Sequence, residues 1–414
     1  MKRPYWLTVL LLVFSAAFTA LILQYFPAPY VWIMMLWATV SFFPFSFAKK
    51  AWTKAFWFNL AVIAFALSST ELYFYEFYFG EEPPRETEYS AVETDTDKTD
   101  IGDLFRHQLL GWAPTKGKSF IEKTRFNNTL LYEVKYTIDE HGLRATSPST
   151  NTNRTQSSCL LFFGDSFTFG EGVKDEETTP YRVTEKVNRS YQVYNFAFLG
   201  FGPHQMLAQL EHGLVDAAIE CTPAIAIYQA LPIHVSRAAG LEGWEAGPKY
   251  VPGEDGMVLW KGRFEQDESE HFLGKFRAFH RDLSKDLRRV LEKSAVYRAL
   301  LFMHRAVNDD DLDVFFRIVV RSNQLVESRY PGARFHVVFW DFSREDRLES
   351  KIILGLKQKG IPVHLISSIL PEYRGHEEKY KIHPADGHPN PLAHDLVADY
   401  IVKTILTPSI VARN

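Results

Sequence analysis

A serine, a histidine and an aspartate stand in this sequence where together they could carry out acyl transfer. The apolar run 160–164 breaks into Gly-Asp-Ser and places Ser166 on a sharp turn that leaves a predicted strand. A serine hydroxyl is a weak nucleophile until a base removes its proton. Near the far end of the chain, Asp386 and His388 lie in a Gly- and Pro-rich segment just before a helical pattern. His388 is the candidate base, and Asp386 could hold its imidazole in the correct tautomer.

The two motifs, GDSFTFGEGV and DGHPN, resemble the first and last blocks of the SGNH/GDSL hydrolase superfamily. The resemblance covers roughly residues 157 to 408, with both motifs in the expected chain order. It implies an α/β fold, namely a flavodoxin-like three-layer α/β/α domain with a parallel sheet, that acts on esters of sugars or lipids. The Asp-x-His spacing, in place of the Asp-x-x-His of many members, is similar to a subset linked to polysaccharide O-acetylation and to related membrane-anchored proteins.

The resemblance also implies an oxyanion hole, the set of donors that stabilises the charge developing on the carbonyl oxygen. In the family these donors are the amide of the serine, here Ser166, a glycine of the second block and an asparagine of the third block. Gly200 fits the second block, with Gly202 as the alternative.

The third-block asparagine is missing from this chain. After a predicted strand over 224–228 the sequence continues QALPIHVSR instead. His234 or Gln229 could reach into the site from this loop, and Arg237 could bind an anionic group of the substrate. The alternative is that the loop only turns the chain and leaves His234 on its surface. The departure puts the usual hydrolytic competence of the family in doubt.

Three apolar segments crowd the first 80 residues: Tyr5–Phe26, Tyr30–Ala48 and Ala55–Phe79. Each approaches or exceeds the ~20 residues that a helix needs to cross a bilayer. A secretory signal would have one shorter apolar core, so three retained transmembrane helices are predicted. The alternative is a hydrophobic hairpin buried in a soluble core.

The positive charges predict the orientation of these helices. Lys2 and Arg3 precede the first apolar segment, and three lysines lie between residues 49 and 54. The third segment is followed by acidic Glu81 and Glu82. The positive-inside rule therefore places the N-terminus in the cytoplasm and the C-terminal domain in the periplasm or outside the cell. The predicted localisation is the cytoplasmic (inner) membrane, with several passes.

The rest of the chain reads as two regions after the helices of residues 1–80. Residues 81–156 are predicted to be a linker and a β-rich lead-in, and residues 157–414 alternate strand and helix patterns, which indicates a parallel sheet. An insertion is expected at about 239–305. Its basic amphipathic part, 269–303, is expected to pack its apolar stripe on the sheet, with a membrane-facing helix as the alternative.

Cys159 and Cys221 are the only cysteines. In the predicted sheet both stand at the N-terminal ends of neighbouring parallel strands, so a disulfide is open to them in an oxidising compartment. Two small buried thiols would explain the same residues. No spacing typical of metal ligands occurs, no cofactor is expected, and a net charge of −4 argues against a nucleic-acid partner.

These observations predict a membrane-anchored serine esterase that forms an acyl intermediate on Ser166 and acts on O-acyl groups, O-acetyl above all, of glycans or lipids. One alternative is an O-acyltransferase of a cell-envelope polysaccharide. Another is a catalytically inactive module of the same fold that binds a glycan or a partner. Predicted partners are the lipid bilayer, the acylated substrate and a polytopic membrane acyltransferase docked on the N-terminal helices.

Overall fold

The chain divides into two compact units in its computed structural model. The first unit comprises residues 1–83 and 268–304, and the second comprises 84–267 and 305–414. The structure describes residues 14–15, 17–19, 21–24, 28–79, 85–91, 105–147, 158–188, 190–241, 246–266, 275–276, 279–280, 283–302, 306–342 and 346–406.

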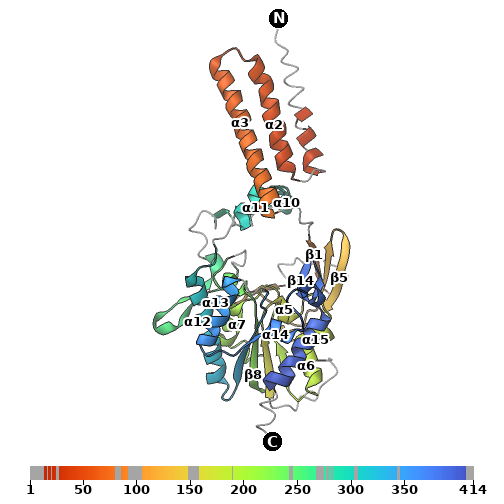
Figure 1. The fold of residues 1–414 in the computed structure, drawn as a ribbon, viewed down its shortest axis with the longest axis vertical. Coiled ribbons are helices and arrows are strands. Elements are labelled where there is room, and N and C mark those ends of the chain that lie inside the picture. Colours follow the sequence, from red (N-terminus) through yellow and green to blue (C-terminus); the bar gives the residue numbers. More distant parts are fainter. Residues whose placement is uncertain are drawn as a thin grey trace. The chain divides into compact units, whose positions relative to one another are not determined.

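The first unit contains two long apolar helices that pack against each other, α2 (Pro29–Phe47) and α3 (Ala51–Tyr73), and α3 continues into η1 (Phe74–Phe79) (Figure 1). The segments Pro29–Ser46 and Ala51–Glu76 are long and apolar enough to cross a membrane. Core helices of soluble proteins and signal sequences pass the same test of length and composition. Most of the predicted first helix, Tyr5–Phe26, lies outside the described residues, so a third span stays a prediction.

Two helices of the insertion, α10 (Lys285–Leu291) and α11 (Ala295–Phe302), also belong to this unit. Glu71 of α3 joins them to the apolar helices. Its carboxylate accepts hydrogen bonds from the backbone N–H of Ala295, from that of Val296 at 3.2 Å and from the Ser294 hydroxyl at 2.9 Å. These contacts satisfy donors at the start of α11 that have no partner within the helix. The expectation that this segment packs on the sheet is therefore wrong.

The second unit is built on a five-stranded parallel sheet with the order β12-β11-β8-β6-β7. Numbered along the chain, the five strands stand in the order 2-1-3-4-5, which is the flavodoxin-like arrangement. Their bounds are β6 Ser158–Phe163, β7 Gln192–Asn195, β8 Thr222–Ala230, β11 Arg334–Phe339 and β12 Val363–Leu365.

Helices cover both faces of this sheet (Figure 1). Alternate residues of β6 enter two separate apolar cores, because successive side chains of a strand point to opposite faces. One core includes α7 (Pro203–Glu211), α12 (Asp309–Arg329) and α13 (Arg347–Gln358). The other includes α6 (Thr179–Lys186), α14 (Ile366–Ile369) and α15 (Pro391–Tyr400). Every residue of β6 is buried, which explains the uninterrupted apolar run in the sequence.

A separate antiparallel sheet precedes the parallel one, with the order β1-β4-β5. Its strands are β1 (Arg85–Ala91), β4 (Phe120–Phe126) and β5 (Thr129–Tyr136). The strands β4 and β5 lie in the segment for which a β-rich lead-in is predicted. The prediction of a linker is wrong for 85–91, because β1 pairs with β4 along its whole length. Residues 92–104 lie outside the described part.

The remaining elements are short. They are β2 (Arg106–His107), β3 (Gly111–Trp112), α5 (Ser166–Phe169), η2 (Asp175–Glu177), α8 (His234–Ala238), β9 (Pro248–Pro252), η3 (Glu254–Gly256), β10 (Val258–Arg263), η4 (Phe264–Gln266), η6 (Glu377–Tyr380), β13 (Lys381–His383), β14 (Asp386–Pro389) and η7 (Ile401–Leu406).

Candidate active site

The turn after β6 places Ser166 at the carboxyl end of the parallel sheet. Gly164 has φ 154°, and a Cβ there would lie 2.1 Å from the Thr168 hydroxyl oxygen, so the turn requires glycine. Asp165 caps the short helix α5 by accepting a hydrogen bond from the Phe167 N–H at 3.1 Å. Ser166 is the first residue of α5. In a sheet of this order, ligands bind where the strand order reverses, between the strands here numbered β6 and β8.

Ser166, His388 and Asp386 form a continuous hydrogen-bonded chain. His388 Nε2 lies 2.9 Å from Ser166 Oγ, and His388 Nδ1 lies 2.6 Å from Asp386 Oδ1. The same Asp386 oxygen accepts the backbone N–H of His388 at 3.1 Å, which fixes the two residues relative to each other. Both come from the hairpin β13–β14, a strand element that the sequence pattern did not predict. The three side chains have the geometry of a nucleophile, its base and the group that orients the base.

Two backbone N–H groups are available as donors for an oxyanion hole. Within the described residues, the N–H groups of Ser166 and Gly200 donate to no acceptor. The carbonyl of the Leu199–Gly200 peptide accepts the indole N–H of Trp112 at 2.7 Å, which fixes the plane of that peptide. The alternative donor, Gly202, is ruled out because its N–H already donates to the Gln205 side chain at 2.8 Å.

His234 is wrong as the predicted oxyanion donor. Its side chain is fully buried, and its Nδ1 accepts from the Leu231 N–H at 3.3 Å and lies 2.6 Å from the Tyr228 hydroxyl. The ring proton is therefore on Nε2, which faces Asp165 Oδ2 at 3.2 Å. The alternative of a surface position is also wrong.

Arg237 is wrong as the predicted substrate-binding cation. Only 7% of it is exposed, and its Nη1 donates to Asp165 Oδ2 and to the Phe201 carbonyl, both at 2.8 Å. Burial alone would raise the pKa of Asp165, but His234 and Arg237 outweigh it and hold the pKa well below its usual range. These two residues thus support the turn beneath the nucleophile.

Gln229, the other candidate donor from this loop, is also fully buried, and its Oε1 accepts the indole N–H of Trp340 at 3.0 Å. Trp340 in turn packs edge-on against Phe167, with ring centroids 5.0 Å apart, and Phe167 contacts the His388 ring. Gln229 therefore supports the aromatic wall beside the triad.

Glu171, which follows α5 in the motif GDSFTFGEGV, is a site residue that the sequence pattern did not predict. Its Oε2 lies 3.2 Å from His388 Nε2, so the same ring nitrogen faces both a hydroxyl and a carboxylate. Behind it, the Tyr132 hydroxyl lies 3.4 Å from Glu171 Oε1 and 3.1 Å from Oε1 of the fully buried Glu122. The feature of the sequence that could have indicated Glu171 is that it is an acidic residue in a stretch of mostly apolar and small residues.

Arg144 was missed as well. Its guanidinium is buried, pairs with Asp175 at 2.9 Å and donates to the carbonyls of Phe169, Gly170 and Val173. These bonds hold the backbone on both sides of Glu171.

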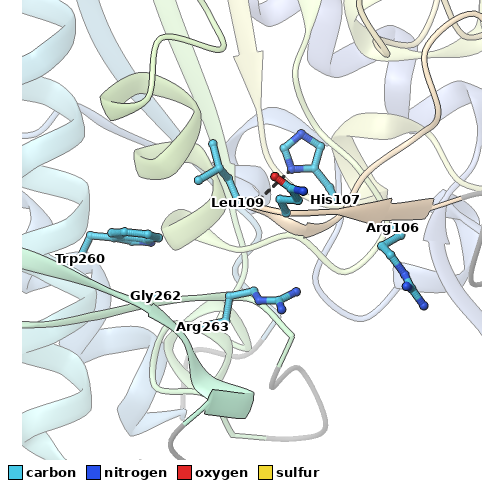
Figure 2. A pocket seen from close by; sticks show the side chains of 7 residues that line it. Arg106, His107, Leu109, Trp260, Gly262 and Arg263 are labelled. Carbon is cyan, nitrogen blue, oxygen red and sulfur yellow. Dashed lines mark hydrogen bonds between the residues drawn. The ribbon is translucent and has the colours of Figure 1, made fainter.

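A pocket of about 260 Å³ lies between the β2–β3 and β9–β10 hairpins of the second unit (Figure 2). Arg106, His107, Trp260 and Arg263 are among the residues that line it. Arg263 is paired with Glu265 at 2.7 Å, so only part of the local positive charge is uncompensated. The lining combines an aromatic face with basic groups.

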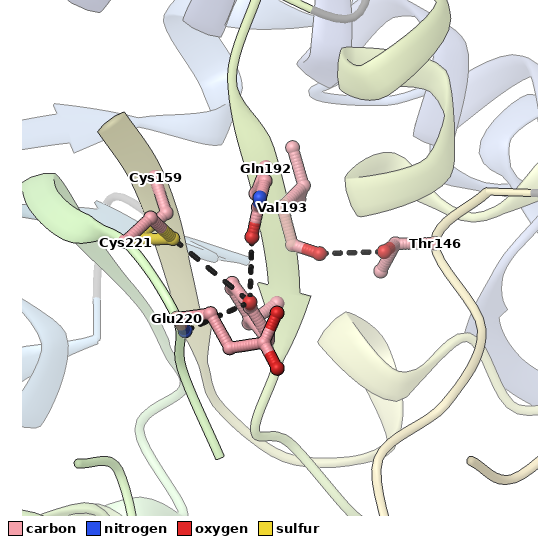
Figure 3. The surroundings of a disulfide bond; sticks show 7 residues. Thr146, Cys159, Gln192, Val193, Glu220 and Cys221 are labelled. Atoms are coloured by element: carbon pink, nitrogen blue, oxygen red, sulfur yellow. Dashed lines mark hydrogen bonds between the residues drawn. A yellow bond between two sulfur atoms is a disulfide. The ribbon is translucent and has the colours of Figure 1, made fainter. Parts of the chain in front are cut away.

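Cys159 and Cys221 form a disulfide in the structure (Figure 3). Cys159 stands in β6 and Cys221 directly precedes β8, so the bond joins the N-terminal ends of two paired strands. It lies at the opposite ends of these strands from Ser166 and has no part in the site. In the described part of the chain, no group of three or more His, Cys, Asp or Glu residues could hold a metal ion.

No protein-family model and no curated protein matches the chain. Similar solved structures include an acetyl xylan esterase from the rumen bacterium Butyrivibrio proteoclasticus, at 11% identity over 72% of each chain with a TM-score of 0.34. A carbohydrate esterase is 10% identical over 78% of this chain and 98% of its own, with a TM-score of 0.33. A protein of the G-D-S-L family from Desulfitobacterium hafniense is 10% identical over 60% and 99%, with a TM-score of 0.30. At TM-scores this low, similarity does not identify an activity.

Proposed function

We propose that the protein is a serine ester hydrolase that forms an acyl intermediate on Ser166. The observation that carries the proposal is the chain of contacts from Ser166 Oγ to His388 Nε2 at 2.9 Å and from His388 Nδ1 to Asp386 at 2.6 Å. Three groups of the right chemistry, brought together from the two ends of one domain, are expected of a nucleophilic site and of few other arrangements.

The reaction follows from this geometry. His388 Nε2 takes the proton of Ser166 as Oγ forms a bond to the ester carbonyl carbon, and the N–H groups of Ser166 and Gly200 stabilise the resulting oxyanion. His388 then gives its proton to the leaving alcohol as the carbonyl–oxygen bond of the ester breaks. A water molecule, activated by the same nitrogen, releases the acid and restores Ser166.

The proposed substrates are O-acyl groups, O-acetyl above all, on glycans or lipids outside the cytoplasmic membrane. Support for the location comes from the apolar helices α2 and α3 and from the basic residues between them. Transfer to a sugar or lipid hydroxyl, in place of water, shares the first half-reaction.

The test uses the purified full-length protein, a fluorophosphonate probe and p-nitrophenyl esters of increasing acyl length. Wild-type protein should be labelled at Ser166 and should turn over the short esters fastest. The matched control is Ser190→Ala, an exposed serine outside the site, which should behave as wild type. Labelling that persists in Ser166→Ala would contradict the proposal, as would a wild-type protein that neither reacts with the probe nor hydrolyses any ester. Adding a polyol acceptor and analysing for its acyl ester separates transfer from hydrolysis.

A further inference from the structure

Glu171 occupies a position that a serine, histidine and aspartate triad does not require. It follows Ser166 by five positions, and its side chain is 10% exposed. Its Oε2 lies 3.2 Å from His388 Nε2, while Ser166 Oγ lies 2.9 Å from the same nitrogen. The nitrogen that should accept the serine proton thus has a second, acidic neighbour.

This contact is favourable only when a proton lies between the two atoms. His388 Nδ1 faces Asp386 at 2.6 Å and therefore carries a hydrogen in the resting site. If Nε2 were bare, it could accept the Ser166 hydroxyl, but its lone pair would also face Oε2 of Glu171 at 3.2 Å, and two acceptors at this distance repel each other. We propose that Glu171 shares a proton with Nε2 of His388 and that loss of this proton sets the pH at which Ser166 becomes a nucleophile. This inference rests on the proposed function.

The surroundings hold Glu171 in place. Arg144 donates to the carbonyls of Phe169 and Gly170 on one side of it and to that of Val173 on the other, at 2.5 to 2.6 Å. The Tyr132 hydroxyl contacts its other carboxylate oxygen, Oε1, at 3.4 Å. Arg144 therefore holds the backbone on both sides of Glu171, and Tyr132 contacts the carboxylate oxygen that does not face His388. Glu171 is a positioning residue in this proposal, because it acts on Ser166 only through His388.

The charged and titratable groups that face His388 come from several elements. Asp386 is on β14, Glu171 follows α5, Glu122 is on β4 and His394 is on α15. Tyr132 of β5 contacts Glu171 and Glu122. Burial lowers the pKa of His394 to about 3, with Arg144 and His388 acting in the same direction, so this ring stays neutral and adds no charge.

The balance at His388 favours the protonated ring. Burial by itself lowers the pKa of His388, but the charges and hydrogen bonds of Glu171 and Asp386 outweigh it and raise the pKa to about 10. Burial, and then the charge of Glu171, raise the pKa of Glu122 to about 7, so Glu122 takes up a proton near neutral pH and contributes less. Below its own pKa, His388 is an imidazolium and cannot accept the serine proton, so reactivity should rise with pH well above neutrality.

The experiment measures the rate at which a fluorophosphonate labels Ser166 in the full-length protein between about pH 6 and about pH 10. Glu171→Gln keeps the shape of the side chain and removes its charge. We expect the midpoint of the rate profile to fall by about 1 to 3 pH units, and labelling at neutral pH to rise about tenfold or more. The control is Glu133→Gln, an exposed residue of β5 paired with Lys123 at 2.6 Å, which should leave the profile unchanged. An unchanged midpoint in Glu171→Gln overturns the proposal.

A second measurement separates this proposal from the proposed function. Diethyl pyrocarbonate modifies neutral imidazole, and mass spectrometry of the peptide that contains His388 reports its protonation without any turnover. If Ser166 is never labelled, the proposed function fails, and the modification profile still tests the shared proton. Glu171→Asp retains the charge on a shorter side chain, so its midpoint should lie between those of wild type and Glu171→Gln. Glu171→Asp replaces Glu171→Gln in the experiment if the latter does not fold. The inference is overturned if the pH dependence of His388 modification is the same in wild type and in every folded variant.

Discussion

Ser166 Oγ lies 2.9 Å from His388 Nε2 although 222 positions separate the two residues in the chain. The parallel sheet explains this proximity. Ser166 follows β6 at the carboxyl end of the sheet, and the hairpin β13–β14 carries His388 to the same end just before α15 packs onto the neighbouring face. Asn390 caps α15 by accepting the Ala393 N–H at 3.1 Å, which fixes the chain two residues after the histidine.

The triad predicts a non-additive set of variants. Ser166→Ala and His388→Ala should each lower kcat/KM by roughly 10⁴-fold or more, and the double variant should be little worse, because both residues serve one proton transfer. Asp386→Asn should cost less than either, since it changes the orientation of the base without removing it. The measurement is ester turnover, with His376→Ala, an exposed histidine, as the control. Independent losses that multiply in the double variant would contradict a shared path.

Trp112 is expected to position the Gly200 N–H of the oxyanion hole without contacting the substrate. Its indole N–H holds the Leu199 carbonyl at 2.7 Å and so fixes the peptide whose N–H belongs to Gly200. Trp112→Phe keeps the aromatic contact with Phe201 but loses this hydrogen bond. We expect kcat to fall about fivefold to tenfold, which corresponds to about 1 kcal/mol, with KM little changed. A rise in KM at constant kcat would assign Trp112 to substrate binding instead.

The ion pair between Asp165 and Arg237 should stabilise the fold in a pH-dependent way. The pKa of Asp165 is held well below its usual range, so its contribution is present above the unfolded value of about 3.9 and is lost as the pH falls through the folded value. Arg237→Met should therefore lower the free energy of unfolding by about 3 to 5 kcal/mol at neutral pH. In thermal unfolding, the difference in stability between Arg237→Met and wild type should become smaller below about pH 4.

Arg182→Met is the control for this comparison. Arg182 forms a partly exposed pair with Glu185 at 3.0 Å, which should contribute less than about 1 kcal/mol at any pH. If Arg237→Met were less stable than wild type by the same amount at neutral and at acid pH, lost packing, and not the charge of Asp165, would explain the destabilisation.

The sequence predicted the parallel sheet and the serine turn because both depend on local patterns. An apolar run as long as a strand indicates full burial, and Gly-Asp-Ser after it specifies a turn that only glycine can begin at Gly164. The roles of His234 and Arg237 were not predictable in this way. They lie on the short helix α8, and only the tertiary fold determines that both side chains point at Asp165.

Two elements were misjudged for a related reason. Residues 85–91 are polar, but β1 lies at the edge of its sheet with solvent on one face, where a polar strand is stable. Residues 285–302 have an amphipathic pattern, which indicates that one face is covered but does not say by what. Glu122 lies on β4, far from the motif in the chain, and the pairing of β4 with β5 brings it beside Tyr132.

The location of the second unit is expected to be outside the cytoplasm. A reporter that is active only after export, such as alkaline phosphatase, should be active when fused after Asn414, and a reporter that works only in the cytoplasm should be inactive there. The physical reason is the cluster of lysines at residues 49, 50 and 54, between the end of α2 and the first turn of α3, which favours the cytoplasmic side. The reverse pattern of activities would invert the topology, and activity of both reporters would indicate that the helices do not span the membrane.

The disulfide gives an independent test of the same location. Cytosolic thiols are kept reduced, so the bond between Cys159 and Cys221 should form only if the second unit is exported. Protein unfolded directly from cells, without reductant, should then expose no thiol to a maleimide probe, whereas a cytoplasmic domain would expose two.

Because the disulfide closes a loop of 62 positions, its loss should lower the free energy of unfolding by about 2 to 4 kcal/mol. Reduced wild type and the double variant Cys159→Ala/Cys221→Ala should therefore melt at similar, lower temperatures, and a melting temperature unaffected by reduction would show that the bond contributes nothing to stability.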